Sequence, residues 1–365
     1  MVRILFILVT FDTGGSERVV FDICRKLDRE RFSPMVVAFS DGPLRKRFEA
    51  LEIPAKAILK QPGIDFRLMG KLARLMTENE IDIINTHHFV TLFYAFWGAK
   101  VAGRRALFHT EHSVWEMTGS RPFWQAVGRR LMRRCDGTIA VSRAVHEHLA
   151  AQGARSHFLP NGIELALFGR SLNGAKRAEL GLAEEDRVIG IVGNLRPEKN
   201  HLGLLRAFAK VAEGMERARL VVVGDGVMRP ALEEEAQRLG LGERVRFLGR
   251  RFDAPQLYRA FDVYCLPSKN EGMPLTVLEA MASGLPVVGT DVLGIGDLLR
   301  ESGAGVLVPY GDDGALAAAL TGLLSDGERA RELAGAGLDY VRREHDLEAK
   351  VRQYEALFAG AVKAS

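Results

Sequence analysis

Two glutamates, Glu271 and Glu279, stand eight residues apart in the segment EGMPLTVLE, which follows a run of apolar residues. Pro274 predicts the start of a helix, so Glu271 is expected in the preceding loop and Glu279 more than one turn inside the helix. The two carboxylates would then touch different parts of one ligand rather than share a proton. The amides of Leu275 and Thr276 would lie in the first turn, where backbone N–H groups have no partner within the helix and attract phosphate. The segment predicts a site for a phosphorylated ligand; the alternative is a surface loop and a helix with a solvated Glu279.

A basic loop, VGNLRPEKN at residues 192–200, lies between another apolar run and a helical pattern. Arg196 and Lys199 would place positive charge beside the same phosphorylated ligand. The chain contains no Asp-x-Asp sequence that could hold a divalent cation, so we predict a site without a metal ion. The alternative is an ordinary basic surface loop, and it is stronger for Arg196 than for Lys199.

The adjacent glycines Gly14 and Gly15 follow the first apolar run of the chain. Glycines let the backbone approach a ligand closely, and Ser16 or Thr13 is predicted to cap the helix that begins there. A pair of glycines is common in turns. Its position after the first predicted strand is what makes this pair a candidate.

Four histidines lie at the ends of two apolar runs: His87 and His88 after one, and His109 and His112 in and after the next. Histidines in such places often only hydrogen-bond backbone groups. From the residues alone, each of the four is more often structural than functional.

A Gly224-Asp225-Gly226 turn follows the apolar run LVVV and invites a dinucleotide-binding interpretation. The third glycine of that fingerprint is replaced by Arg229, which argues against a nicotinamide enzyme. We expect this turn, with residues 249–251, to line a nucleotide pocket.

The elements that must position these residues are visible as apolar runs rich in β-branched residues, alternating with helical patterns. Such runs are typical of parallel strands that helices bury on both faces. The predicted strands of the first half are residues 2–9, 34–40, 54–59, 81–86, 105–110, 137–142 and 156–160, and those of the second half are 187–193, 219–224, 244–248, 263–267, 286–289 and 306–309. The pattern predicts two doubly wound α/β domains in series, with ligand bound in the cleft between them at the carboxyl ends of the strands.

We place the N-terminal domain at residues 1–165 and the C-terminal domain at residues 166–346, with the boundary in the turn-rich stretch that begins at Pro160. The closing segment, 347–365, is expected to form a helix that packs back on the N-terminal domain, with the C-terminal domain as the alternative.

The chain resembles the retaining glycosyltransferases of family 4, whose GT-B fold consists of two Rossmann-like domains that face each other across a cleft. The resemblance rests on Glu271 and Glu279, which match the Glu-x7-Glu signature of the family, and on the basic loop, which matches its Gly-Arg-Leu-x-x-x-Lys loop. It implies that Glu271 approaches hydroxyls of the donor sugar, that Glu279 holds the ribose, and that Lys199 neutralises the leaving diphosphate. Asn194 stands where the family has arginine, and whether Arg196 restores that charge is open.

The resemblance also assigns Gly14 and Gly15 to the loop that faces the donor phosphates and the acceptor, and His112 to the contact with the donor sugar. The catalytic roles that it implies fall on His112, Glu271, Lys199 and Arg196. The donor-binding residues that it implies are Gly14, Gly15, Gly193, Asn194, Arg196, Lys199, Gly224, Gly272, Met273, Pro274, Leu275, Thr276 and Glu279.

By the same resemblance, the protein transfers a hexosyl group, with retention of configuration, from a nucleotide-diphosphate sugar to a hydroxyl of a glycan or a lipid-linked acceptor. This is the reaction of enzymes that assemble bacterial surface polysaccharide or lipopolysaccharide. UDP is the most frequent nucleotide in the family, and no cofactor besides the sugar nucleotide is expected. The alternatives are a nucleotide-sugar epimerase or hydrolase of the same fold, and a binding protein that has lost catalysis, for which Asn194 is the only hint.

An arginine-rich segment at residues 121–134 is predicted to be a helix with an apolar side and a basic side. Residues 1–165 carry 24 Lys and Arg against 17 Asp and Glu, whereas the whole chain has a net charge of +4. This bias slightly favours contact with an anionic membrane surface over the alternative of a core helix with a solvated basic face. The residues that would make the contact are Arg121, Trp124, Arg129, Arg130, Arg133 and Arg134.

The composition, 47% hydrophobic and 26% charged over 365 residues, is that of a soluble globular protein of two domains. The three cysteines have neither paired nor metal-ligand spacing, which favours a reducing compartment. The apolar run at the start is too short to span a bilayer and lacks a signal-cleavage site. We therefore expect a cytoplasmic protein, peripheral on the inner membrane face, with no nucleic-acid partner.

Overall fold

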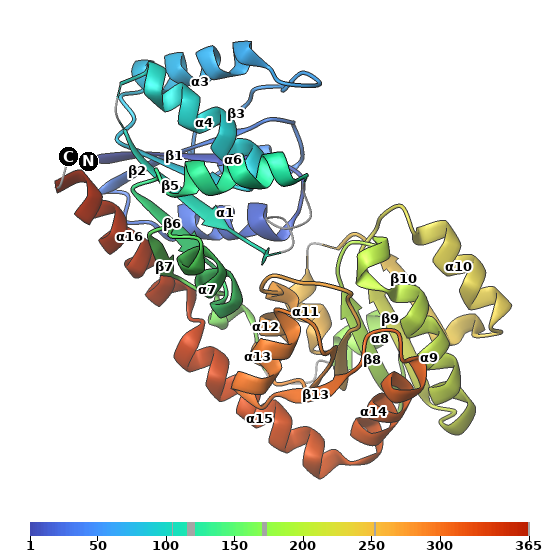
Figure 1. Ribbon diagram of the computed structural model, residues 1–365. Helices are drawn as coiled ribbons and strands as arrows, with labels where there is room; N and C mark the ends of the chain where they lie inside the picture. The colour runs from blue at the N-terminus through green and yellow to red at the C-terminus, as the bar shows by residue number, and fades with distance from the viewer. Residues whose placement is uncertain (104, 115–120, 170–173, 252, 364–365) are drawn as a thin grey trace. The chain divides into compact units, whose positions relative to one another are not determined.

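The computed structural model describes residues 1–103, 105–114, 121–169, 174–251 and 253–363. The chain forms two compact units: Met1–Gly162 together with the C-terminal helix α16 (Leu347–Lys363), and Ile163–Asp346 (Figure 1). Every apolar run that the sequence predicts as a strand overlaps a strand of the structure, which confirms the α/β architecture. Among the described residues, no helix is long and apolar enough to cross a membrane.

The N-terminal unit is built on a parallel sheet with the strand order β3-β2-β1-β4-β5-β6-β7. Its strands are β1 (Val2–Leu8), β2 (Phe32–Ala38), β3 (Ala55–Ala57), β4 (Ile83–His87), β5 (Ala106–Glu111), β6 (Gly137–Ala140) and β7 (Ser156–Phe158). Its described helices are α1 (Gly15–Lys26), α2 (Leu44–Glu49), α3 (Phe66–Glu78), α4 (Phe89–Val101), α6 (Pro122–Met132), α7 (Arg143–Ala151) and α16.

The C-terminal helix α16 completes the core of the N-terminal unit. Phe358 of α16 is fully buried, and its ring packs edge-on against Phe6 of β1 and Phe108 of β5. Leu5 and Leu107, which alternate with these residues along the two strands, belong to the core on the opposite face. The sheet is therefore buried on both sides, as continuous apolar strands require.

The C-terminal unit is built on a second parallel sheet, with the order β10-β9-β8-β11-β12-β13. Its strands are β8 (Arg187–Val192), β9 (Ala218–Val223), β10 (Val245–Gly249), β11 (Val263–Leu266), β12 (Val287–Thr290) and β13 (Gly305–Val308). Its helices are α8 (Gly174–Glu179), α9 (His201–Gly214), α10 (Arg229–Arg238), α11 (Ala254–Tyr258), α12 (Leu275–Ala282), α13 (Ile295–Ser302), α14 (Asp313–Ser325) and α15 (Gly327–Glu344), and Pro197–Lys199 forms a single 3-10 turn.

The strand order reverses once in each sheet, between β1 and β4 and between β8 and β11. At such a point the loops leaving the two strands run to opposite faces of the sheet and leave room for a ligand. The loops after β1 and β4 carry Gly14 and His88, and the loops after β8 and β11 carry Lys199 and Glu271. Both reversals thus coincide with the motifs singled out in the sequence.

Candidate functional site

The basic loop and the Glu-x7-Glu segment meet at the reversal point of the C-terminal sheet. Lys199 Nζ lies 2.5 Å from Glu271 Oε1, and Ser268 donates a hydrogen bond of 2.7 Å to the same oxygen. The amide of Lys269 also donates to the carbonyl of Glu198, at 2.8 Å. Two loops far apart in the chain are therefore joined through both side chains and backbone.

The neighbouring positions of the basic loop differ in their surroundings. Arg196 is exposed and makes no ion pair with any residue that the structure describes, whereas Lys199 is half-buried and paired. Asn194 is half-buried, and its carbonyl accepts from the amide of Arg196 at 2.9 Å. The ion pair therefore includes the lysine but not the arginine of this loop.

Helix α12 begins directly after the loop of Glu271. Pro274 is the N-cap residue, one position before the first helical residue and not within the first turn as its sequence context predicts. The amides of Leu275 and Thr276 donate to no residue that the structure describes. This helix start carries two unpaired donors and the positive end of the helix dipole, a combination suited to a phosphate.

Glu279 lies on the buried side of α12, with 5% of its surface exposed. Its Oε2 accepts a hydrogen bond of 2.7 Å from the hydroxyl of Tyr258, at the end of α11. A buried carboxylate is costly unless hydrogen bonds satisfy it, and the Tyr258 hydroxyl supplies one of them. The solvated Glu279 considered as the alternative interpretation is therefore wrong.

The backbone conformation and the close surroundings of Gly224 both require a glycine. Its φ is +138°, and a Cβ at this position would lie 1.8 Å from the carbonyl oxygen of Gly193. The loop after β8 runs beside the loop after β9, and the amide of Leu195 donates to the carbonyl of Asp225 at 3.0 Å. The close contact between these two loops explains the glycine without a ligand, and a role of Gly224 in donor binding stays a prediction.

In the N-terminal unit, the two adjacent glycines have different surroundings. Gly14 is the N-cap of α1, and a Cβ there would lie 2.1 Å from Oε2 of Glu17, whereas a Cβ on Gly15 would meet nothing within 4 Å. No side chain caps α1, so the prediction of a cap from Thr13 or Ser16 is wrong. The Ser16 hydroxyl instead donates to Glu17 at 2.9 Å and lies 2.7 Å from Nε2 of His88.

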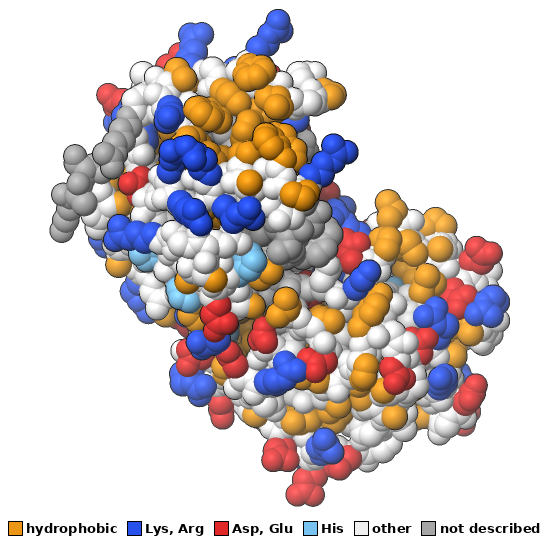
Figure 2. All heavy atoms as spheres, in the orientation of Figure 1, with side chains coloured by type: hydrophobic (Ala, Val, Ile, Leu, Met, Phe, Trp, Pro, Cys, Tyr) orange, Lys and Arg blue, Asp and Glu red, His pale blue; other side chains and the backbone are white. Residues whose placement is uncertain are grey.

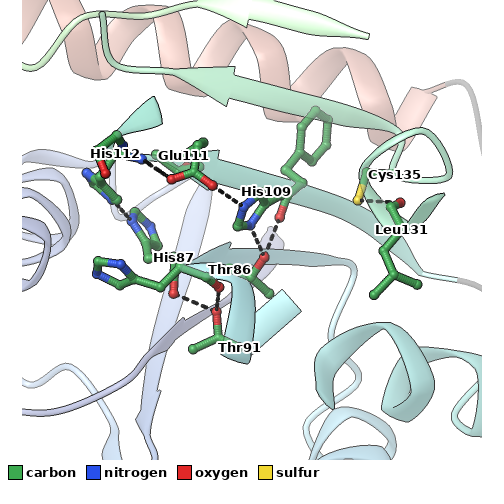
Figure 3. Close-up of polar contacts among 12 residues, drawn as sticks. Thr86, His87, Thr91, His109, Glu111, His112, Leu131 and Cys135 are labelled. Carbon is green, nitrogen blue, oxygen red and sulfur yellow. Dashed lines mark hydrogen bonds and ion pairs between the residues drawn. The ribbon is translucent and has the colours of Figure 1, made fainter. Parts of the chain in front are cut away.

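His87 and His112 meet near the reversal point of the N-terminal sheet (Figure 3). Nδ1 of His87 lies 2.8 Å from Nε2 of His112, with the two rings edge to edge and 5.1 Å between their centroids. His88 stacks on His112 at 5.3 Å and has a positive φ of 70°. His87 and His88 are predicted from the sequence as structural residues, yet both contact His112, which the resemblance assigns to the donor sugar.

Glu111, at the end of β5, fixes the backbone at His112 through hydrogen bonds. Its Oε1 accepts from the amides of His112 and Ser113, at 2.9 and 3.2 Å, and its Oε2 lies 3.5 Å from His109 (Figure 3). Burial, with the positive charge that His88 and His109 can carry, holds the pKa of His112 well below its ordinary value. His112 is therefore a neutral ring near pH 7.

Neither unit shows a metal centre in the part of the chain that the structure describes. No group of three or more His, Cys, Asp or Glu side chains is placed to hold a metal ion there. The three cysteines are free and buried. Metal-independent catalysis stays a prediction, because the diphosphate of a substrate can itself bring a cation.

The arginine-rich segment forms α6, with one face on the core and one end exposed. Leu131 and Met132 are buried, and Trp124 packs against Phe89 and Phe93 of α4. Phe123, which the helical pattern places on the apolar side, is 68% exposed. The arginines that the structure leaves exposed are Arg121, Arg130, Arg133 and Arg134, whereas Arg129 is half-buried.

Comparison with known proteins extends over both units. Residues 13–167 match the family described as Glycosyltransferase Family 4, and residues 173–338 match the family described as Glycosyl transferases group 1. A protein of Bacillus subtilis named as the glycosyltransferase EpsF is 30% identical over 308 residues, which is 79% of each chain. The chain belongs to glycosyltransferase family 4. It is a transferase of the GT-B type, as the two Rossmann-like units also indicate.

Two further similar proteins are described by what they act on or bind. The UDP-Gal:alpha-D-GlcNAc-diphosphoundecaprenol alpha-1,3-galactosyltransferase of Escherichia coli is 27% identical over 316 residues, or 82% of each chain. The crystal structure of HepE from Anabaena in complex with UDP-glucose has a TM-score of 0.87, with 25% identity and complete coverage of both chains.

In this glycosyltransferase, the described structure brings the predicted Lys199 and Glu271 into direct contact. Two supporting residues, Ser268 and Tyr258, were not foreseen from the sequence, and His87 was predicted only as a structural residue. Ser268 could have been suspected, because it lies three residues before Glu271 at the end of a predicted strand. Tyr258 carries no such signal, because its contact with Glu279 spans 21 residues and two helices.

Proposed function

We propose that this glycosyltransferase transfers a hexosyl group from a UDP-sugar to a hydroxyl of a glycan or lipid-linked acceptor, with retention and without a metal ion. The observation that carries the proposal is the pairing of Lys199 with Glu271 beside the start of α12. It is supported by the complex of HepE with UDP-glucose and by the diphosphoundecaprenol acceptor in the name of the E. coli relative.

The resting ion pair suggests how the donor is accommodated. On binding, Lys199 would exchange Glu271 for the diphosphate, and the amides of Leu275 and Thr276 would donate to a phosphate oxygen. Glu271 would be released from the lysine but would still be held by Ser268. It would then accept hydrogen bonds from hydroxyl groups of the sugar. An ionised carboxylate suits this role because its two oxygens accept several hydrogen bonds.

The same residues would lower the barrier to departure of the diphosphate. Negative charge grows on the leaving oxygen as the bond to the anomeric carbon breaks, and Lys199 with the positive end of α12 would stabilise it. Arg196 would contribute from the exposed side of the loop. Glu279 would hold the ribose, and His112 would bind a sugar hydroxyl. We propose a same-face displacement with no covalent intermediate, and isolation of a glycosyl-enzyme would contradict that step.

The experiment that tests this function is thermal stabilisation of the purified protein by UDP, GDP, ADP and their glucose conjugates, with EDTA present. We expect a shift with UDP and UDP-glucose that shrinks in Lys199→Ala and Glu279→Ala. A shift that appears only after addition of Mg²⁺ would contradict metal independence. The same shift in both variants and the wild type would contradict the assigned site.

We further propose that the N-terminal unit rests on an anionic bilayer, where a lipid-linked acceptor would be found. Hydrophobic side chains gather over α3, α4 and α6 with lysines and arginines beside them (Figure 2), and α4 packs against both other helices. Phe66 and Val101 are each 74% exposed, and Lys100 lies over the ring of Trp97 at 5.2 Å. Exposed aromatic and aliphatic groups beside cationic ones match the interface of a bilayer that carries negative headgroups.

A further inference from the structure

His112 is the last member of a hydrogen-bonded chain that begins deep in the N-terminal sheet. Asn85 and His87 of β4 are fully buried, and Oδ1 of Asn85 lies 2.9 Å from Nε2 of His87. Nδ1 of His87 in turn lies 2.8 Å from Nε2 of His112 (Figure 3). Nδ1 of His112 hydrogen-bonds no residue that the structure describes, and the residue as a whole is half-buried.

The order of donors and acceptors along this chain follows from Asn85. Its Nδ2 donates to the hydroxyl of Thr110 at 3.0 Å, and its carbonyl oxygen faces His87 and accepts from the same hydroxyl at 3.4 Å. A carbonyl oxygen only accepts, and Nε2 of His87 must therefore carry a proton.

The tautomer of His112 follows by the same logic. Burial and the neighbouring histidines hold the pKa of both His87 and His112 well below the ordinary value, so each ring carries one proton near pH 7. With its proton on Nε2, His87 can only accept at Nδ1, and His112 must donate from its own Nε2. The remaining nitrogen, Nδ1 of His112, is left with a lone pair.

We propose that His87 is a positioning residue which, through Asn85, holds His112 in the tautomer protonated at Nε2, so that Nδ1 accepts a hydrogen bond from a substrate hydroxyl. The role toward a substrate rests on the proposed transferase function, whereas the tautomer is a property of the resting protein. The hydrogen bond to His87 and the ring of His88, whose centroid lies 5.3 Å from that of His112, restrict the orientation of the ring, and Glu111 fixes its backbone. A ring held in this way favours an O–H group and disfavours a carboxylate or carbonyl oxygen at the same position, because two lone pairs would meet.

The tautomer can be measured directly by long-range 1H–15N correlation on the full-length protein labelled with 15N-histidine. The resonances of His112 are identified by their loss in His112→Gln. We expect one protonated nitrogen, Nε2, and one unprotonated nitrogen, Nδ1. A proton on Nδ1 of His112, or a doubly protonated ring near pH 7, would overturn the proposal.

Three variants test whether the chain from Asn85 sets this state. Asn85→Leu removes the acceptor and should give a mixture of tautomers at His112, whereas Asn85→Asp keeps an acceptor and should preserve the wild-type state. Thr91→Val is the matched control, because Thr91 donates to the backbone carbonyl of His87 and touches neither ring. An unchanged tautomer in a folded Asn85→Leu would overturn the proposal. If Asn85→Leu does not fold, the spectra of the wild type and of Asn85→Asp still test the proposed tautomer.

Measurement of kcat/KM in these variants then tests whether the tautomer of His112 matters for the substrate. With UDP-glucose as the probe, we expect kcat/KM to fall about tenfold in Asn85→Leu and to recover in Asn85→Asp, as for the loss of one hydrogen bond in the transition state. Unaltered kcat/KM with a mixed tautomer would refute the substrate role of Nδ1. Absence of UDP binding with the expected tautomer would instead refute the proposed function.

Discussion

Lys199 and Glu271 form an ion pair, with 2.5 Å between Nζ and Oε1, although 72 residues separate them in the chain. The pair balances the charge of both side chains before any substrate arrives, and Ser268 keeps Glu271 in place when the lysine leaves. Under the proposed function, a diphosphate would have to compete with this carboxylate for Lys199. We expect the diphosphate to win because it offers more charge and more acceptor oxygens.

Lys199 and Arg196, the two cations of the basic loop, should contribute unequally to catalysis. We expect Lys199→Ala to lower kcat by about a hundredfold or more, because a preorganised cation beside the leaving group is lost. Arg196→Ala should cost about tenfold or less, because this side chain is exposed and its charge is screened. Steady-state kinetics measure the loss of kcat in each variant, and unfolding curves verify that both variants are folded. Equal losses would show that Arg196 carries the charge that Asn194 lacks.

The hydroxyl of Tyr258 should be needed for both stability and nucleotide affinity. Tyr258→Phe leaves the buried Glu279 carboxylate without this donor, which should cost about 1–3 kcal/mol of unfolding free energy. It should also weaken UDP binding, because Glu279 is no longer oriented. Denaturant unfolding and calorimetric titration measure the two effects. Tyr340→Phe is the matched control, since Tyr340 donates at 2.9 Å to Glu301 of the same unit; an equal loss of UDP affinity there would contradict the prediction.

The two adjacent glycines should respond differently to alanine. Gly14→Ala puts a methyl group 2.1 Å from the Glu17 carboxylate, which must turn away, and replaces glycine by a poorer N-cap residue, so it should destabilise the protein by about 0.5–1 kcal/mol. Gly15→Ala meets nothing and replaces a glycine inside a helix, so it should be neutral or stabilise by about 0.5–1 kcal/mol. Thermal unfolding distinguishes them, and similar transitions for the two variants would contradict the described loop.

His201 should make the protein sensitive to acid. It is buried with no partner for either ring nitrogen among the described residues, and burial, followed by the charge of Lys199, lowers its pKa from 6.5 to about 4. Between these values the unfolded chain binds the proton and the folded chain does not, so stability falls as the pH drops from about 6.5 and levels off below about 4. The total loss is about 3 kcal/mol. Denaturant unfolding of wild type and His201→Leu across this range should show a shallower slope in the variant, and parallel curves would refute the assignment.

The exposed apolar groups of the N-terminal unit should govern binding to lipid. Phe123→Glu should reduce binding to vesicles of phosphatidylcholine and phosphatidylglycerol several-fold, because it removes apolar contact and adds repulsion. Val227→Glu is the control, since Val227 is 80% exposed in the other unit. Vesicle flotation with increasing phosphatidylglycerol gives the dependence on charge. No binding by the wild type, or equal binding by both variants, would contradict the proposed surface.

Much of the fold could be predicted from the sequence because each parallel strand is buried on both faces. Leu220, Val221, Val222 and Val223 are all buried, with alternate residues in different cores, and such a run needs no alternation of polar residues. The positions of the motifs after the strands then followed from connectivity alone. The start of α12 was misplaced by one residue, because proline suits both the N-cap and the first turn.

The supporting contacts of the site could not be predicted in the same way. Tyr258 reaches Glu279, and His87 reaches His112, through side chains on separate elements whose approach depends on three-dimensional packing. Local propensity says nothing about such a pair, and a histidine at a strand end looks the same whether it binds a carbonyl or another ring. The helical pattern likewise placed Phe123 on an apolar side without showing that the neighbouring surface would leave it exposed.

The last helix gives this chain an unusual order of assembly. Phe358 seals a core whose other members, Phe6 and Phe108, are synthesised hundreds of residues earlier. The unit between Ile163 and Asp346 is, in topological terms, an insertion, so all of it is synthesised before α16. Until α16 has been synthesised, part of the sheet of the other unit stays uncovered. Truncation of a few turns at the carboxyl terminus would therefore damage the beginning of the protein rather than its end.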